Sequence, residues 1–369
     1  MITIRRYNTE TFLKTLAACM LACASTAVHA QSSVTFYGIA DAGIVVEDGG
    51  ANGRITKVTS GVGAASRFGF RGVEDLGGGT AAFFTLEAGA KIDTGEIDAA
   101  GTIFNRQALV GLRGGFGAVA LGRQYTPYHT AMVTIVDPFT TGYAGSAKSL
   151  FPHNGTNIRT SNTISYATPK KNGFDAELAY STGEQGDASL GRQFGGAVGY
   201  ADGPLAVRLV YNNKNTDVAA SGATPAVDRT LGRNYLLGAS YNLGWLKLHG
   251  GFSVDKGDNA APLINPNNPY GGARPTPSTD GRSILIGISA PVKGGTLMAS
   301  VLHKDDRTAF NQDANAWGIG YLYALSKRTG LYAAYGHVDN RNGAGYTIAN
   351  NTESGSGDTG YNLGLRHSF

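Results

Sequence analysis

Apolar and polar residues alternate along most of this chain, so that every second position is apolar. Three of the clearest segments carry their apolar residues on one parity: Leu205, Val207, Leu209 and Tyr211; Ile284, Ile286 and Ile288; and Trp317, Ile319, Tyr321 and Tyr323. Successive side chains of a β-strand point to opposite faces, so each segment predicts a strand with one apolar and one polar face. About sixteen such segments of about ten residues recur, which is the length of a tilted strand that crosses a membrane.

Short and long connections alternate between these predicted strands. Short turns, most of them rich in glycine, lie at 76–79, 113–115, 171–173, 202–204, 242–244, 293–295 and 327–330. The Asn-Gly and Asp-Gly pairs among them suit tight hairpins because they accept a positive φ. Longer polar stretches such as 215–229, 257–281 and 341–357 lie between the turns. Short turns on one side and long loops on the other are typical of an outer-membrane barrel, and both chain ends then fall on the short-turn side.

A soluble β-sandwich or jelly roll would also show alternation. The polar faces here hold Gly, Ala, Ser and Asn, and few of the lysines that protect the edges of soluble sheets. Aromatic residues gather near strand ends, as in Phe36-Tyr37 and Tyr321 with Tyr323, which interfacial aromatic girdles explain. We therefore predict an all-β fold, a 16-stranded antiparallel transmembrane β-barrel.

The first thirty residues predict a secretory signal peptide. Arg5, Arg6 and Lys14 precede an apolar stretch that ends in Val28-His29-Ala30, so cleavage would leave a mature chain of residues 31–369. A membrane anchor is the alternative, although the stretch is short for a bilayer. A lipoprotein signal is another, because residues 16–19 (LAAC) resemble a lipidation box.

Composition excludes several classes of function. Both cysteines, Cys19 and Cys23, lie in the signal, so the mature chain has no disulfide, cysteine nucleophile or cysteine metal ligand. Without the signal the formal charge falls from +4 to +2, which does not indicate a nucleic-acid partner. The histidines are scattered, with no HExxH or GxSxG motif, and the cluster of His303 with 304–306 is typical of a solvated loop rim. We expect no enzyme activity, metal or cofactor.

Six stretches of the mature chain resemble the general porins of Gram-negative outer membranes, in particular those of β-proteobacteria. These stretches are SSVTFYGIADAGI, SRFGFRGVEDLGGGTAAFFTLEAG, FNRQALVGLRGGFGAVALGRQYTP, SNTISYATPKKNGFDAELAYSTG, SKRTGLYAAYGHVDN and GLRHSF. The resemblance implies a homotrimer in contact with outer-membrane lipid and lipopolysaccharide, through which small hydrophilic solutes and ions diffuse passively. It also implies that the amphipathic last strand and its terminal Phe369 are the signal read by the barrel assembly machinery.

The longest early break in the strand pattern, residues 126–158, corresponds to the porin loop that folds into the lumen and narrows it. It follows the fifth predicted strand and contains DPFTTGY (137–143), although Thr140-Thr141 departs from the Gly-rich run of some relatives and leaves the path of the loop open. Opposite this loop porins carry a ladder of arginines, whose planar guanidinium groups stay charged. The candidates here are Arg67, Arg106, Arg123 and Arg159. Arg67 should point inward because Phe68 and Phe70 share the other parity, whereas the parity of Arg106 is ambiguous.

The charge balance at this constriction predicts a modest preference for anions. The loop carries one acid, Asp137, against Lys148, His129 and His153, and Asp41 on the first strand could temper the preference. Screening acts over about 8 Å at physiological salt, so charges at a narrow point count for more than charges on distant loops. A channel specific for one anion, such as phosphate or a dicarboxylate, is the alternative.

Overall fold

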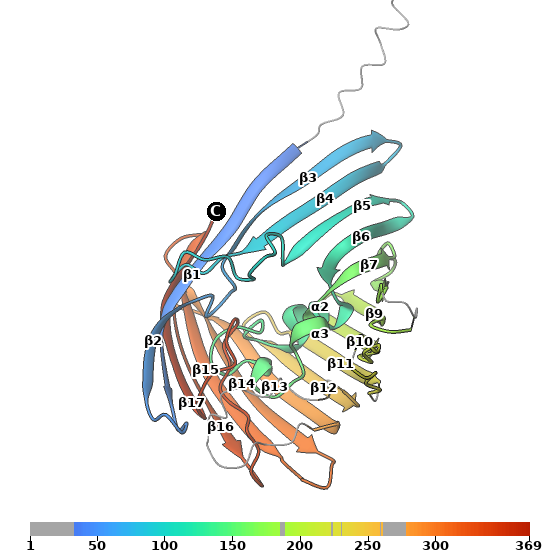
Figure 1. Ribbon diagram of the computed structural model, residues 1–369. Helices are drawn as coiled ribbons and strands as arrows, with labels where there is room; N and C mark the ends of the chain where they lie inside the picture. The colour runs from blue at the N-terminus through green and yellow to red at the C-terminus, as the bar shows by residue number, and fades with distance from the viewer. Residues whose placement is uncertain (1–32, 185–188, 223, 230, 259, 261–277) are drawn as a thin grey trace, which may run out of the picture.

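The computed structural model describes residues 33–184, 189–222, 224–229, 231–258, 260 and 278–369. The predicted signal peptide, 1–30, lies outside the described residues. The strands form one antiparallel sheet that closes into a barrel (Figure 1). They are β1 (Ser33–Asp48), β2 (Ile55–Ser60), β3 (Arg67–Gly77), β4 (Thr80–Gly89), β5 (Gln107–Gly114), β6 (Gly117–Tyr125), β7 (Arg159–Ala167), β8 (Phe174–Ser181), β9 (Gln193–Asp202), β10 (Leu205–Lys214), β11 (Gly232–Asn242), β12 (Lys247–Lys256), β13 (Asp280–Val292), β14 (Gly295–Asp306), β15 (Ala314–Ala324), β16 (Thr329–Asn340) and β17 (Thr359–Ser368).

These segments make sixteen barrel strands, because β2 and β3 are two parts of one strand. Both pair with β1, β2 along its 42–47 part and β3 along its 33–39 part. The strand is interrupted at 61–66. On its other edge β1 pairs with β17, from Ile39 opposite Ser368 to Asp48 opposite Thr359, and this pairing closes the barrel. The predicted fold class and strand number are therefore confirmed.

Outward positions carry the apolar residues, as the alternation predicted. Leu209 and Ile286 are 55 % and 62 % exposed, whereas their neighbours Val210 and Leu285 are buried. Such an exposed apolar band would be unfavourable in water and is expected where a barrel meets lipid. Among the described residues no helix is long and apolar enough to cross a bilayer.

Residues 126–158, here called loop 3, fold into the barrel (Figure 1). The loop contains α2 (Pro127–Ala131), the π-helical turn η1 (Met132–Val136), the 3₁₀ turn η2 (Ala147–Ser149) and α3 (Gly155–Ile158). Its buried apolar residues form one core with inward residues of the wall. On the loop these are Tyr128, Met132, Phe139, Leu150 and Phe151, and on the wall Val210, Leu236, Leu285, Met298 and Tyr332. The expected inward loop is confirmed.

Glycines on the inner wall let loop 3 approach the backbone of the strands. A Cβ atom on Gly238 of β11 would lie 2.7 Å from Val136 Cγ2, and one on Gly287 of β13 would lie 2.6 Å from Pro138 Cγ. A Cβ atom on Gly145 of the loop would lie 2.7 Å from the Cα atom of Gly318 of β15. Real Cβ atoms do not come this close, so a larger side chain would displace the loop. The small inward residues of these strands therefore pack against the loop, whereas the sequence pattern had placed them against water.

Candidate constriction site

The lumen contains a cavity of about 550 Å³ between loop 3 and the wall formed by the first strands. Five cationic side chains line it: Arg67, Arg106, Lys148, Arg159 and Arg366. Asp98 is the carboxylate among the lining residues, which also include His129 and His153. The cavity therefore combines an excess of positive charge with limited volume, which is the arrangement expected of a charge-selective constriction.

A buried carboxylate holds two of these arginines side by side. The Nε atom of Arg106 lies 2.8 Å from one oxygen of Glu87, and the Nε atom of Arg67 lies 3.5 Å from the other. The hydroxyl of Tyr37 donates to Glu87 at 3.0 Å, and Arg106 also donates to the hydroxyl of Tyr125 at 2.8 Å. Glu87 is 3 % exposed, so it fixes the two guanidinium groups from behind. The ambiguous parity of Arg106 is thereby resolved: it faces the lumen just before β5 begins.

A stack of planar groups holds Arg159. Its guanidinium carbon lies 5.0 Å from the centre of the Tyr125 ring, and that ring stacks on His129 at 4.3 Å. His129 and His153 share a hydrogen bond of 2.8 Å between Nδ1 and Nε2. Burial lowers the pKa of both imidazoles, that of His153 to about 3, and the Arg159 charge adds to the shift of both, as the Lys148 charge does for His153. The two histidines are therefore neutral at physiological pH and support the stack without adding charge.

Lys148 brings a fourth predicted residue to the cavity from the η2 turn of loop 3. Its ammonium group donates to the backbone carbonyl of Asn351, which belongs to the connection between β16 and β17. Burial, together with the nearby Arg159 charge, lowers the pKa of Lys148 to about 8. A desolvated ammonium beside another cation is easier to deprotonate, so Lys148 is the cation of this site that can lose its charge near neutral pH.

Asp137 does not line the cavity, in contrast to the charge balance expected from the sequence. It is 1 % exposed and accepts backbone N–H bonds within loop 3 from Phe139 at 2.9 Å, Thr141 at 3.0 Å and Ala147 at 2.9 Å. Burial raises the pKa of its carboxyl group to about 6. These bonds fix a turn in which Thr140 and Thr141 have φ values of 52° and 63°, a left-handed conformation that β-branched residues rarely adopt. Asp137 thus fixes the conformation of loop 3, and the cavity has one carboxylate fewer than the sequence predicted.

Arg123 is also absent from the cavity lining. Its guanidinium donates to the Asn105 carbonyl at 2.5 Å and to the hydroxyl of Ser161 at 2.9 Å. Arg123 shares the parity of Leu121, which is 48 % exposed, whereas Ala120 and Gln124 on the other parity are buried, so the alternation of β6 itself places Arg123 on the outer face.

Two further residues behave differently from their sequence pattern. Arg366 of β17 lines the cavity, and its inward parity was visible in the sequence although its role was missed. Asp41 of β1 does point inward, but it is fully buried and accepts bonds from Val62 N at 3.0 Å, Ala64 N at 2.9 Å and the Tyr332 hydroxyl at 2.8 Å. Asp41 therefore holds the interruption between β2 and β3 in place and does not face the cavity.

Within the described part of the chain, no group of three or more His, Cys, Asp or Glu side chains could hold a metal ion. The site is a wall of positively charged side chains held in fixed positions, which can act on a passing solute through their electric field.

Comparison with known proteins identifies the family. The profile of a family described as Gram-negative porin matches residues 15–343. Outer membrane porin protein 32 of Delftia acidovorans is 35 % identical over 96 % of this chain and 99 % of the relative, and an outer membrane porin protein of Bordetella pertussis is 31 % identical with the same coverage. A solved anion-selective porin from Comamonas acidovorans superposes with a TM-score of 0.72 at 32 % identity, over 92 % of this chain and all of that one. This chain belongs to the Gram-negative porins and is a β-barrel of the outer membrane.

Proposed function

We propose that this porin, which forms a water-filled channel for small hydrophilic solutes, prefers anions over cations. The observation that carries the proposal is the charge of the cavity wall, where five cationic side chains meet the carboxylate of Asp98 among the described residues. The similar porin from Comamonas acidovorans is described as anion-selective, which supports the same sign here.

We propose that Arg67, Arg106, Arg159 and Lys148 are the constriction residues that produce this preference. Arginine side chains remain charged at every physiological pH. Their effect is largest where the channel is narrow, because screening acts over about 8 Å at physiological salt and about 3 Å at 1 M. The preference should therefore weaken as salt rises.

Reversal potentials across a planar bilayer test this proposal. Replacing Arg67 and Arg159 together by alanine should lower the anion-to-cation permeability ratio. Arg123→Ala is the control, because it removes one positive charge from a residue that does not line the cavity. Cation preference in the wild type, or an unchanged ratio in the double variant, would contradict the proposal.

A channel specific for one anion is the second candidate. It is favoured by the convergence of several cations on one small cavity, which could bind a multiply charged anion such as phosphate or a dicarboxylate. Conductance that saturates at a low concentration of one such anion would support a specific channel, and conductance that rises linearly supports the general pore.

We further propose that the chain works as a homotrimer without enzymatic activity, in contact with lipid and lipopolysaccharide. The porin resemblance supports the trimer, and three-step closure of single channels at high voltage would test it. We also propose that Phe369 is read by the barrel assembly machinery, because it ends the closing strand and its ring lies 5.6 Å from Phe36.

A further inference from the structure

A second loop reaches the constriction next to loop 3. Residues 341–358, here called loop 8, connect β16 to β17 and fold inward, so that Ala344, Ile348 and Ala349 are buried. Asn351 and Thr352 of this loop line the same cavity as the arginines. Loop 8 is therefore part of the wall that a solute passes.

Asn351 connects loop 8 to two other parts of the constriction, the 61–66 interruption and loop 3. Its backbone N–H donates to Val62 O at 3.1 Å, and its side-chain oxygen accepts from Ala65 N at 2.9 Å. Its side-chain nitrogen donates to Thr141 O of loop 3 at 3.2 Å. Its backbone carbonyl accepts from Lys148, so the place of this cavity cation depends on where loop 8 lies.

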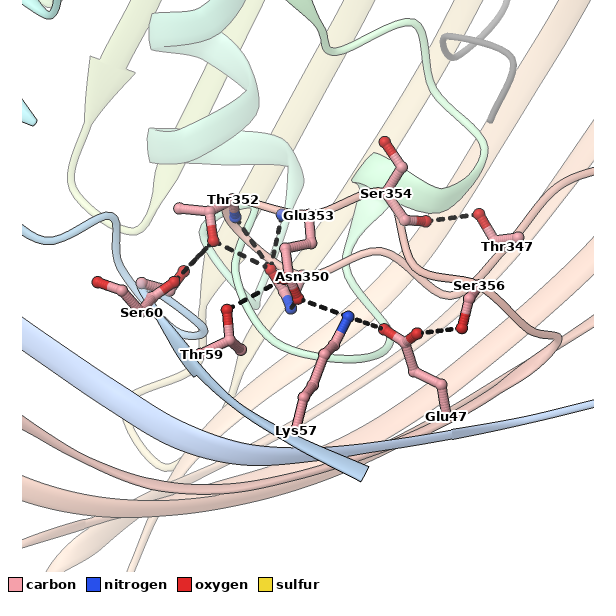
Figure 2. Close-up of polar contacts among 11 residues, drawn as sticks. Glu47, Lys57, Thr59, Ser60, Thr347, Asn350, Thr352, Glu353, Ser354 and Ser356 are labelled. Atoms are coloured by element: carbon pink, nitrogen blue, oxygen red, sulfur yellow. Dashed lines mark hydrogen bonds and ion pairs between the residues drawn. The ribbon is translucent and has the colours of Figure 1, made fainter. Parts of the chain in front are cut away.

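An ion-pair network behind the cavity holds loop 8 in this place (Figure 2). Lys57 of β2 lies 3.0 Å from a Glu353 oxygen on loop 8 and 3.0 Å from a Glu47 oxygen on β1. Thr59 of β2 donates to Glu353 at 3.1 Å, and Ser356 of loop 8 donates to Glu47. Glu353 is two residues from Asn351, so the network ties the cavity wall to the first hairpin of the barrel.

We propose that Lys57 and Glu353 are positioning residues of the constriction: their ion pair anchors loop 8, and loop 8 in turn fixes Asn351 and Lys148 at the cavity. Neither Lys57 nor Glu353 lines the cavity itself. Releasing the pair lets loop 8 leave the wall, which widens the passage and takes the carbonyl partner from Lys148. The inference rests on the proposed function, since it concerns the selectivity of that same channel.

Glu353→Ala separates this inference from a simple charge effect. Removing a carboxylate near a cationic cavity should raise anion preference if only charge matters. Loss of the anchor should lower anion preference, because a wider passage places ions farther from the arginines. The variant also leaves Lys57 paired with the buried Glu47, so no buried charge loses its partner.

Single-channel recording at 1 M salt reports the geometry, because screening over about 3 Å removes most of the effect of a distant charge. In Glu353→Ala, a level of higher conductance should be occupied about tenfold more often than in the wild type, equivalent to ~1.4 kcal/mol. At 0.1 M salt the anion-to-cation permeability ratio should fall. Lys57→Arg, which keeps the charge, should leave the wild-type trace unchanged.

Glu96→Ala is the matched control, because Glu96 forms an ion pair of the same length, 3.0 Å, with Lys91 on an exposed outer loop. It should leave both readouts unchanged. An unchanged conductance in Glu353→Ala, or an increase in its anion preference, would overturn the inference. A wild type without anion preference would instead overturn the proposed function, and the conductance readout at 1 M salt would still decide whether loop 8 is anchored by this pair.

Discussion

Lys148 should make the selectivity of this channel depend on pH between 7 and 9. Its pKa is lowered to about 8, so roughly 90 % of the ammonium groups are charged at pH 7 and roughly 10 % at pH 9. The charged form of a base exists below its pKa, so raising the pH removes one of the five cavity cations. Arg67, Arg106, Arg159 and Arg366 stay charged over this range. The pKa of His129 and that of His153 are lowered by burial, so these side chains stay neutral. Anion preference should therefore fall as pH rises, without being abolished.

The size of the cavity sets the magnitude of this effect. Taken as a sphere, a volume of about 550 Å³ has a radius of about 5 Å, and a unit charge on its wall then contributes ~0.8 kcal/mol at the centre in water. Screening at physiological salt reduces this to ~0.4 kcal/mol, a factor of about two in the local concentration of each ion. Since anions and cations change in opposite directions, the anion-to-cation permeability ratio should fall about fourfold between fully charged and neutral Lys148.

Reversal potentials in a salt gradient, measured at pH 7 and at pH 9 on the same bilayer, give the ratio directly. Lys148→Met should show the lower ratio at both pH values, and its ratio should not change with pH. Lys256→Met removes the same charge from an exposed ion pair with Asp280 and should keep the wild-type pH dependence. A wild-type ratio that is constant from pH 7 to pH 9, or an equal pH dependence in Lys148→Met, would refute the reasoning.

Two further predictions concern the barrel itself. Gly318→Val should displace loop 3, because a side chain there meets Gly145 of the loop. It should lower the free energy of unfolding by about 1–3 kcal/mol, measured by thermal unfolding, and should make the open-channel current noisier. Gly250→Ala, whose added Cβ meets nothing closer than 3.9 Å, should unfold like the wild type. Deleting Phe369 removes its two backbone hydrogen bonds with Gly38, each 3.1 Å, and the contact of its ring with that of Phe36. Less folded barrel should therefore reach the outer membrane. An equal yield of folded barrel, detected by its heat-dependent mobility on gels, would contradict this prediction.

The sequence was sufficient to predict the barrel because the signal repeats in every strand. The alternation at Leu209 and Val210 recurs in many strands, for example β11 and β13, and a strand of fixed period gives each residue one of two faces. The seven predicted short turns fall between paired strands among the described residues, for example at 202–205 and 292–295. Arg67 could be placed on the inner face for the same reason, since Phe70 on the opposite parity faces outward.

Parity alone could not predict the constriction in full, because the residues that depart from it are at irregular backbone. Arg106 precedes its strand, so it does not obey the alternation that follows it. Arg123 was placed at the constriction by its position next to loop 3, although it shares the outward parity of Leu121. The sequence also gives no sign that the carboxylates of Asp41 and Asp137 accept hydrogen bonds from backbone N–H groups, because only the folded loops bring these groups near them. Loop 8 is missed for a related reason: its long, polar stretch is typical of a solvent-exposed loop, and its inward fold depends on the distant Glu47 and Lys57.

The apolar packing of loop 3 against the barrel wall and the cationic cavity beside the loop depend on each other. Loop 3 buries Tyr128, Phe139 and Phe151 against the glycine-bearing strands, and this packing keeps the loop close to one side of the barrel. The remaining space is narrow and lies against strands that carry arginines, of which Arg67 and Arg106 share the carboxylate of Glu87. In the described part of the chain no carboxylate pairs with Arg159, whose guanidinium group instead lies over the Tyr125 ring in a cation–π contact. A cluster of like charges is costly to assemble, so apolar packing on the far side of the loop must hold it together. We therefore expect that enlarging a wall glycine such as Gly318 alters ion preference as well as stability, although this residue does not line the cavity.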